Sequence, residues 1–204
     1  METKERILIK AGELFRGLGI KNVTMDSLAS DLGISMRTIY ECFSHKDDLV
    51  ISTMLYYIQN ENEELSKIVN ESKHVVEAMF KIIKHKRELL DSYSPLFKKD
   101  IARYLPRIIK LYYTRADDLK RYSLSYILLE RGIKEGVFKE GINIKIVDSF
   151  LQDLMVTMHK SQRIVLLKPN EREILENIFI PYFKGLSTPK GIELMDEFFG
   201  KLEE

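Results

Sequence analysis

The 204-residue chain is poor in several residue types, and each shortage excludes a class of protein. It has one cysteine, so no disulfide can form within the chain, and a lone cysteine fits a reducing compartment. Its 5 prolines and 10 glycines are few, which is typical of a helical soluble protein, and it has no low-complexity tract. Cys42 is expected to be a small buried apolar side chain, with a redox sensor as the alternative.

Long apolar runs and an excess of charge of either sign are also missing. No stretch reaches the ~20 apolar residues that a membrane-spanning helix needs, and the amino terminus lacks the apolar run of a signal peptide. We therefore expect a cytoplasmic protein with no membrane partner. The formal net charge is only +1, although residues 1–50 carry 7 Lys and Arg against 8 Asp and Glu, and residues 73–121 carry 13 against 6. The basic middle stretch is interpreted as a solvated face, with an anionic ligand as the alternative.

What the sequence does contain is helical periodicity with sharp boundaries. Residues 25–32 and 36–43 read as two short amphipathic helices. Thr24 and Ser35 are expected to cap them, because a side-chain hydroxyl before a helix accepts a hydrogen bond from a free N–H of its first turn. Gly33 is expected to end the first helix in the left-handed conformation. Such a helix–turn–helix can place its second helix in the major groove of DNA.

Apolar residues at helical spacing extend this unit on both sides. An amphipathic helix is predicted over residues 2–18, and a long helix is predicted from Lys46 to about Asn70. The first three helices should form a small bundle. Its predicted core is Phe15, Leu28, Ile39 and Phe43.

Two runs of sequence here follow a recognisable pattern. They are A-G-E-L-F-R-G-L-G-I-K-N-V-T-M, and L-A-S-D-L-G-I-S followed by M-R-T and I-Y-E-C-F-S-H-K-D-D-L. In these runs the chain resembles the TetR (tetracycline repressor) family of bacterial transcription regulators, over roughly its first quarter. Cys42 departs from the pattern, because the family often has an aromatic residue or His there. Beyond about residue 60, the resemblance implies only an all-helical ligand-binding and dimerisation domain.

The whole chain is expected to be all-α. A three-helix helix–turn–helix DNA-binding domain is predicted over residues 1–48, and a helical ligand-binding and dimerisation domain over residues 49–204. The helices predicted in the second domain cover residues 75–90, 98–113, 117–135, 144–165, 171–184 and 188–201. Those over 144–165 and 171–184 have wider apolar surfaces than one small core needs. They are predicted to form a four-helix interface with a second copy.

The second helix of the helix–turn–helix supplies the candidate DNA contacts. Arg37 is the best reader of bases, because its guanidinium matches the edge of guanine. Met36 and Thr38 would contact thymine methyl groups. The full expected set is Ser35, Met36, Arg37 and Thr38, with Thr24, Tyr40 and Lys46 at positions that the resemblance implies contact phosphates. The alternative is a structural helix–turn–helix whose polar residues are only solvated.

The second domain is rich in tyrosine and methionine, which suits a mostly apolar ligand pocket with a few polar tips. The candidate lining residues are Tyr93, Phe97, Tyr104, Tyr113, Tyr122, Tyr126, Met155 and His159. The alternative for each of them is an ordinary place in the core or on the surface. The sequence has no glycine-rich phosphate loop, no metal-ligand spacing among its four His and no nucleophile motif, so we expect no enzyme, metal site or cofactor.

These observations predict a homodimeric, sequence-specific DNA-binding transcriptional regulator. The resemblance implies a ligand-responsive repressor. Its expected partners are an operator in double-stranded DNA, a second copy of the chain and an unidentified small-molecule effector. Two alternatives stay open: a transcriptional activator of the same fold, and a helical protein-interaction module whose helix–turn–helix does not bind DNA. The slight excess of acidic residues in residues 1–50 motivates the protein-interaction alternative. A steep salt dependence of DNA binding would argue against that alternative.

Overall fold

The computed structural model describes residues 2–114, 123–161, 166–167 and 170–200. These residues are mainly helical and contain no strand, only an isolated bridge between Phe138 and Ser187, so the predicted all-α fold is confirmed. Among the described helices, none is long and apolar enough to cross a membrane. The chain divides into two compact units, which are Met1–Glu64 with Lys84–Leu119, and Leu65–Ile83 with Lys120–Glu204.

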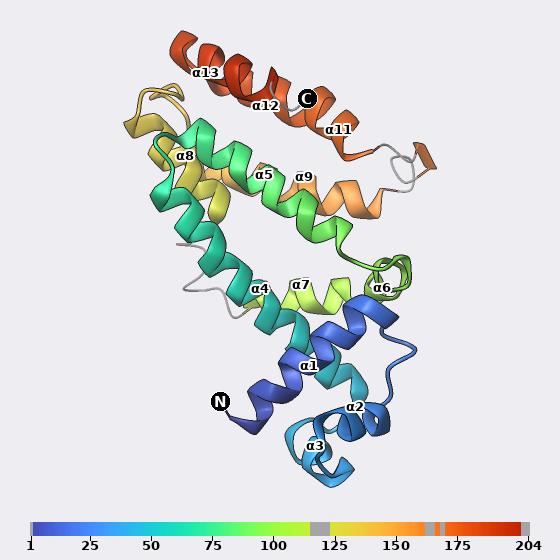
Figure 1. The fold of residues 1–204 in the computed structure, drawn as a ribbon. Helices are drawn as coiled ribbons and strands as arrows, with labels where there is room; N and C mark the ends of the chain where they lie inside the picture. Colours follow the sequence, from blue (N-terminus) through green and yellow to red (C-terminus); the bar gives the residue numbers. More distant parts are fainter. Residues whose placement is uncertain (1, 115–122, 162–165, 168–169, 201–204) are drawn as a thin grey trace. The chain divides into compact units, whose positions relative to one another are not determined.

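The first unit begins with three short helices and the start of a long one (Figure 1). These are α1 (Thr3–Leu18), α2 (Met25–Leu32), α3 (Met36–Cys42) and the first part of α4 (Lys46–Glu71). The second part of α5 (Val75–Asp91) belongs to the same unit, together with α6 (Pro95–Ile101) and α7 (Leu105–Thr114).

Local hydrogen bonds set the bounds of α2 and α3 where the sequence predicts them. The Ser27 N–H donates to the Thr24 hydroxyl at 2.9 Å, and the Thr24 N–H donates to the Ser27 hydroxyl at 3.0 Å, which completes a capping box. Gly33 ends α2 with φ 64°, in the left-handed region that favours glycine. Ser35 caps α3 by accepting the Thr38 N–H at 3.1 Å. A cap of this kind stabilises a helix by about 1 kcal/mol.

The predicted core of the three-helix head is confirmed. Phe15, Leu28, Ile39 and Phe43 are all buried in one apolar cluster. Cys42 is partly buried and packs against the same cluster.

The head does not complete this core alone, because α4 and the α6–α7 pair contribute to it. Leu49 and Val50 from the first turns of α4 are buried there, and so are Phe97 from α6 and Ile108 from α7. The helix–turn–helix therefore shares its apolar core with Phe97 and Ile108, which lie more than 50 positions further along the chain.

The turn between α1 and α2 lies directly on α6. Gly19 has φ 86° and ψ 150°, and a Cβ added to it would lie 2.8 Å from the Leu96 Cβ. Beside it, the backbone N–H of Lys21 donates to the Asp100 carboxylate at 2.9 Å, and the Lys21 ammonium lies 3.7 Å from the same group. Asp100 is only 9% exposed, so this pairing holds a nearly buried charge.

The helix predicted over residues 98–113 is divided into two in the structure. α6 begins earlier, at Pro95, because proline suits the first turn of a helix, where its missing N–H has no helical partner to lose. The Ser94 hydroxyl caps this start by accepting the Phe97 N–H at 3.2 Å. Pro106 is the second residue of α7, so a new helix start accommodates it, which is one of the two outcomes expected for this proline.

The second unit contains the remaining helices together with the end of α4 and the start of α5. These are α8 (Leu124–Lys134), α9 (Ile144–Lys160), α11 (Glu171–Ile174), the π-helical η2 (Leu175–Phe179), α12 (Ile180–Leu186) and α13 (Pro189–Gly200). Parts of three predicted helices, residues 117–122, 162–165 and 201, lie outside the described residues. The core of this unit is Val75, Val76, Met79, Leu129, Val137, Phe138, Leu151 and Met195.

The helix predicted over residues 171–184 is present with a change in its winding. Its middle, Leu175–Phe179, is π-helical, and Pro181 follows in the first turn of α12. A proline cannot donate to the carbonyl four residues earlier and its ring crowds that carbonyl, which a local widening of the helix relieves.

The predicted boundary between residues 48 and 49 separates a DNA-binding domain from a ligand-binding and dimerisation domain. This boundary stays a prediction. The compact units change at residues 64 and 65, within α4, and the first unit also takes in residues 84–119.

Candidate nucleic-acid interface

α3 buries one side and exposes the other. Ile39 is fully buried, whereas the neighbouring Met36 and Tyr40 are 40% and 47% exposed. The Arg37 side chain is 87% exposed. Large apolar and cationic side chains thus share a solvent-facing surface on a short helix, which is the composition expected of a surface that reads base edges.

Arg37 is held loosely on this surface. Its Nε donates to a Glu41 carboxylate oxygen at 2.9 Å, one helical turn further on. An exposed pair of this kind contributes only about 0.3–0.5 kcal/mol, so the guanidinium can leave it for a base or a phosphate at small cost. Sequence reasoning missed Glu41, although its i,i+4 spacing from Arg37 was the signal that could have found it.

Ser35 and Thr38 are tied to one another at the start of α3. Their hydroxyl oxygens lie 2.9 Å apart, and Ser35 also caps the helix. The capping box occupies the Thr24 hydroxyl as an acceptor, while among the described residues its own proton has no recorded acceptor. Thr24 is therefore a suitable donor to a phosphate oxygen.

Lys46 is anchored at the first turn of α4. Its ammonium donates to the Lys21 carbonyl at 3.4 Å, so the side chain reaches the turn between α1 and α2. Partial burial lowers the pKa of Lys46, and the nearby Asp100 and Asp47 carboxylates oppose that shift. The structure thus places a positioned cation beside the helix–turn–helix.

Two acidic residues follow Lys46, and one is bound from the turn before α7 and the other from α7 itself. The Tyr104 hydroxyl donates to Asp47 at 3.0 Å, and an Arg107 guanidinium nitrogen lies 3.6 Å from Asp48. These contacts join residues 57 and 59 positions apart, so no local pattern could have indicated them. They explain how the head tolerates an excess of acidic residues near its cations.

The predicted ligand-lining residues are distributed over both units. Tyr93, Phe97 and Tyr104 lie on the core of the first unit, where the Tyr93 and Phe97 rings meet edge to face at 5.0 Å. Burial raises the pKa of Tyr93, and burial together with the hydrogen bond to Asp47 raises the pKa of Tyr104. Tyr126 is half-buried on α8 of the second unit.

The other ligand candidates cannot be placed in the same way. Tyr122 lies outside the described residues, and Tyr113, Met155 and His159 lie on α7 and α9 without described side chains. A pocket lined by the whole set stays a prediction.

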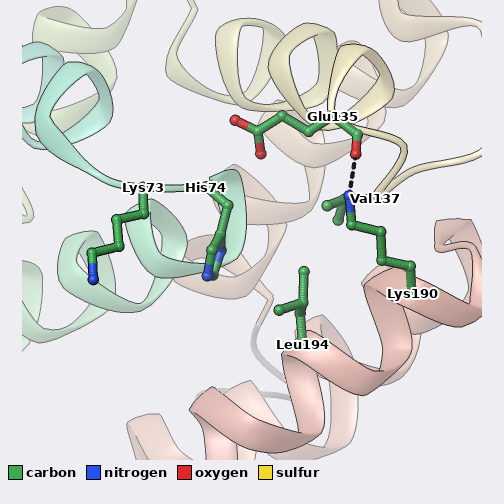
Figure 2. A pocket seen from close by; sticks show the side chains of 6 residues that line it. All are labelled: Lys73, His74, Glu135, Val137, Lys190 and Leu194. Carbon is green, nitrogen blue, oxygen red and sulfur yellow. Dashed lines mark hydrogen bonds between the residues drawn. The ribbon is translucent and has the colours of Figure 1, made fainter.

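The second unit has a hollow of about 350 Å³ at the junction of α5, α8 and α13 (Figure 2). It is lined by Lys73, His74, Glu135, Val137, Lys190 and Leu194. Glu135 accepts the Val75 N–H at 2.7 Å through its carboxylate and the Lys190 ammonium at 2.8 Å through its carbonyl. The His74 Nδ1 accepts the Glu77 N–H at 3.2 Å. Because these polar atoms join the three helices, we interpret the hollow as a structural junction, and no predicted ligand residue lines it.

Arg131 completes this junction from α8. Its guanidinium donates to the carbonyls of Val69 and Ser72 at the end of α4, the latter at 2.6 Å, and to the Glu135 carboxylate at 2.5 Å. One ion pair therefore satisfies free carbonyls at the end of α4 and a free N–H at the start of α5.

Comparisons with known proteins agree with this geometry. Residues 7–53 match the sequence model of a family described as bacterial regulatory proteins, tetR family. An HTH-type transcriptional regulator of Staphylococcus aureus is 33% identical over 75 residues, which cover 37% of this chain and 37% of that relative. A transcriptional regulator from Cytophaga hutchinsonii has the same fold with a TM-score of 0.61 at 22% identity, over 97% of this chain and 96% of that one.

A TetR-family transcriptional regulator from Agrobacterium tumefaciens is similar as well, with a TM-score of 0.59 at 17% identity over 91% of this chain and 97% of that one. The likeness to these structures shows the fold along nearly the whole chain. The family match contains most of α1, all of α2 and α3 and the start of α4, and the candidate interface lies within it. Residues 7–53 are therefore similar to the amino-terminal segment of the tetR family of bacterial regulatory proteins, and the predicted resemblance is confirmed.

Proposed function

We propose that this protein is a sequence-specific DNA-binding transcriptional regulator that acts as a homodimer. The observation that carries the proposal is the exposed surface of α3, where Met36, Arg37 and Tyr40 face solvent while Ile39 anchors the helix. This surface belongs to the segment that matches a family of regulatory proteins, and we propose no enzymatic activity.

In this proposal the helix–turn–helix reads bases with α3 and binds phosphates at its edges. Arg37 forms two hydrogen bonds to a guanine, an interaction that discriminates against other bases by about 1–3 kcal/mol. Met36 packs against a thymine methyl group. Thr24, Tyr40 and Lys46 bind phosphates, and Ser35 and Thr38 hold the start of α3 against the groove.

A second copy of the chain is proposed to cover the exposed apolar surface of α9. Ile146 and Phe150 are 66% and 47% exposed there, and the Phe150 ring lies 5.2 Å from the ring of Tyr182 on α12. Exposed apolar surface of this kind typically marks an interface. Ile146, Phe150 and Tyr182 fall within the predicted dimer segments, 144–165 and 171–184. A two-fold dimer would place two α3 helices in successive major grooves, about 34–36 Å apart.

The response to a small molecule is proposed to act through α6. This helix lies on the turn that leads into α2, through Leu96 beside Gly19 and through Asp100 bound to Lys21. A ligand that moves α6 therefore moves the helix–turn–helix. A coupling of about 1–3 kcal/mol is enough to change DNA affinity by roughly 5–150-fold. Repression is the proposed outcome, and activation by the same fold is the alternative.

The test is DNA binding by the full chain to the duplex that precedes its own gene, followed by footprinting. Arg37→Ala combined with Tyr40→Phe should abolish the footprint and leave only weak, salt-sensitive binding. The matched control is Lys134→Ala, which removes an exposed cation that also pairs with a carboxylate one turn away, Glu130 at 3.3 Å. An unchanged footprint in the double variant would refute the assignment of α3 and favour the protein-interaction alternative.

A further inference from the structure

The helices α6 and α7 present cations to solvent beside the helix–turn–helix. Residues 94–114 contain five Lys and Arg and a single acidic residue, Asp100. That carboxylate is nearly buried and paired with Lys21. The cations are all exposed, and they are Lys98, Lys99, Arg103, Arg107 and Lys110.

Three of these cations have no carboxylate partner among the described residues. They are Lys98, Lys99 and Arg103, which we call the α6–α7 cationic surface. The Arg103 guanidinium lies over the ring of Tyr104, whose centroid is 5.7 Å away. Arg107 is different, because it pairs with Asp48, and it is left out of this surface.

The cationic surface is joined to the candidate DNA interface by contacts within the first unit. Tyr104, in the turn before α7, binds Asp47, and Arg107, in the first turn of α7, pairs with Asp48. On the other side, Lys46 reaches the Lys21 carbonyl, and the Lys21 N–H is bound by Asp100 of α6. The amino end of α4, which carries a proposed phosphate contact, is thus fixed against both α6 and α7.

The segment that contains the helix–turn–helix and the segment that contains α6 and α7 differ in net charge. Residues 1–50 carry 7 cations against 8 acids, a net charge of −1, whereas residues 94–114 carry 5 against 1, a net charge of +4. Binding to the DNA backbone depends on cations that replace condensed counterions. The segment that contains the helix–turn–helix therefore has no net positive charge of its own, whereas the segment of α6 and α7 does.

We propose that Lys98, Lys99 and Arg103 bind phosphates of the duplex that flanks each half-site, and so extend the DNA interface beyond the helix–turn–helix. This inference rests on the proposed function, since it requires that α3 and Lys46 bind DNA. Duplex DNA is the occupant that the structure favours, because Asp100, Tyr104 and Arg107 bind the segments around Lys46, and the net charge of residues 94–114 is +4.

The experiment compares the full chain with a triple variant, Lys98→Gln, Lys99→Gln and Arg103→Gln. Two duplexes carry the same footprinted palindrome, and one of them has about ten extra base pairs on each side. Affinity is measured by fluorescence anisotropy over a series of salt concentrations. On the long duplex, three lost phosphate contacts per subunit should lower the slope of log affinity against log salt by about 2.7 per subunit, or about 5 for a dimer. On the short duplex the two proteins should behave alike.

A matched control removes the same number of charges from the second unit. This control is the triple variant Lys73→Gln, Lys81→Gln and Lys134→Gln. The three lysines are exposed and lie outside the candidate interface. This control should keep the wild-type slope on both duplexes, which separates a local contact from an effect of net charge. Circular dichroism and the thermal midpoint verify that both triple variants are folded.

The outcomes separate this inference from the function on which it rests. If the wild type binds and the α6–α7 variant keeps its slope on the long duplex, the inference is wrong and the proposed function stands. The same result would follow if an acidic protein or an anionic membrane were the true occupant. An equal loss of slope on both duplexes would refute the flanking position. Failure of the wild type to bind any duplex at low salt would refute both proposals.

Discussion

The close approach of α6 to the turn between α1 and α2 makes a sharp prediction about Gly19. Its φ of 86° and ψ of 150° lie in a region that residues other than glycine avoid, and an added Cβ would be 2.8 Å from the Leu96 Cβ. The backbone strain alone costs about 1–3 kcal/mol, and α6 must also shift to relieve the contact. We expect Gly19→Ala to lower the free energy of unfolding by about 3 kcal/mol, or the melting temperature by about 6–12 °C.

Two other glycines serve as matched controls, because each isolates one part of this cost. Gly33 has φ 64° but open space around it, so Gly33→Ala should cost only the left-handed strain of about 1 kcal/mol. Gly17 lies within α1 with open space and an ordinary φ, so Gly17→Ala should stabilise the protein by about 0.5–1 kcal/mol. Urea unfolding monitored by circular dichroism measures all three. A cost for Gly19→Ala no larger than that for Gly33→Ala would refute the docking of α6 on this turn.

Three further predictions concern single side chains. Arg131→Met should destabilise the protein by about 2–3 kcal/mol in urea unfolding, because it leaves the Glu135 carboxylate and two helix-end carbonyls without their partner; an unchanged midpoint would contradict the capping role. Thr53 is fully buried, and its hydroxyl has no hydrogen-bond partner among the described residues. Thr53→Val should therefore raise the unfolding free energy by about 1 kcal/mol, and a loss of stability would reveal a missed partner. Hydrogen bonds from Lys81 and a backbone N–H lower the pKa of Glu77, so its contribution to stability is present above the ordinary value of 4.5 and is lost as the pH falls through the lowered pKa. Glu77→Gln should flatten the acid limb of the stability curve, and a curve that still matches the wild type would exclude this contribution.

The bounds of α2 and α3 could be predicted because their determinants are local. The capping hydroxyls of Thr24 and Ser35 act on N–H groups three residues away, and Gly33 needs only its own backbone freedom. Such signals are complete within a short stretch of sequence. The exposed contact surface of α3 follows from them, since fixing the helix and burying Ile39 decides which residues face solvent.

The environment of that surface could not be predicted, because it depends on contacts between distant residues. Nothing near Asp47 indicates that the hydroxyl of Tyr104 will bind it. Tyr93 and Phe97 were candidates for a ligand pocket on grounds of composition, and composition does not say whether an aromatic ring faces a cavity or a neighbouring ring. The π-helical turn before Pro181 likewise depends on how the chain relieves one crowded carbonyl.

The pairing of Arg107 with Asp48 gives a final test of how the head manages its acidic residues. The two groups lie 3.6 Å apart and are 59% and 38% exposed, so the pair contributes less than about 1 kcal/mol to folding. Its expected importance is for DNA binding, because Arg107→Gln leaves an uncompensated carboxylate two residues from Lys46. That variant should weaken operator binding several-fold at low salt, and Asp48→Asn in the same chain should restore most of the loss.

This restoration distinguishes two roles for the arginine. If Arg107 only neutralises Asp48, the coupling between the two substitutions should account for nearly the whole effect in a double-mutant cycle. If Arg107 itself binds a phosphate, removing Asp48 will not replace the lost cation, and affinity will stay low. From the net charge of the sequence alone, Asp48 would be expected to weaken DNA binding. In the structure, Asp48 is paired with Arg107, so the two charges cancel locally. The double-mutant cycle measures whether this pairing or the unpaired charge of Asp48 determines the DNA affinity.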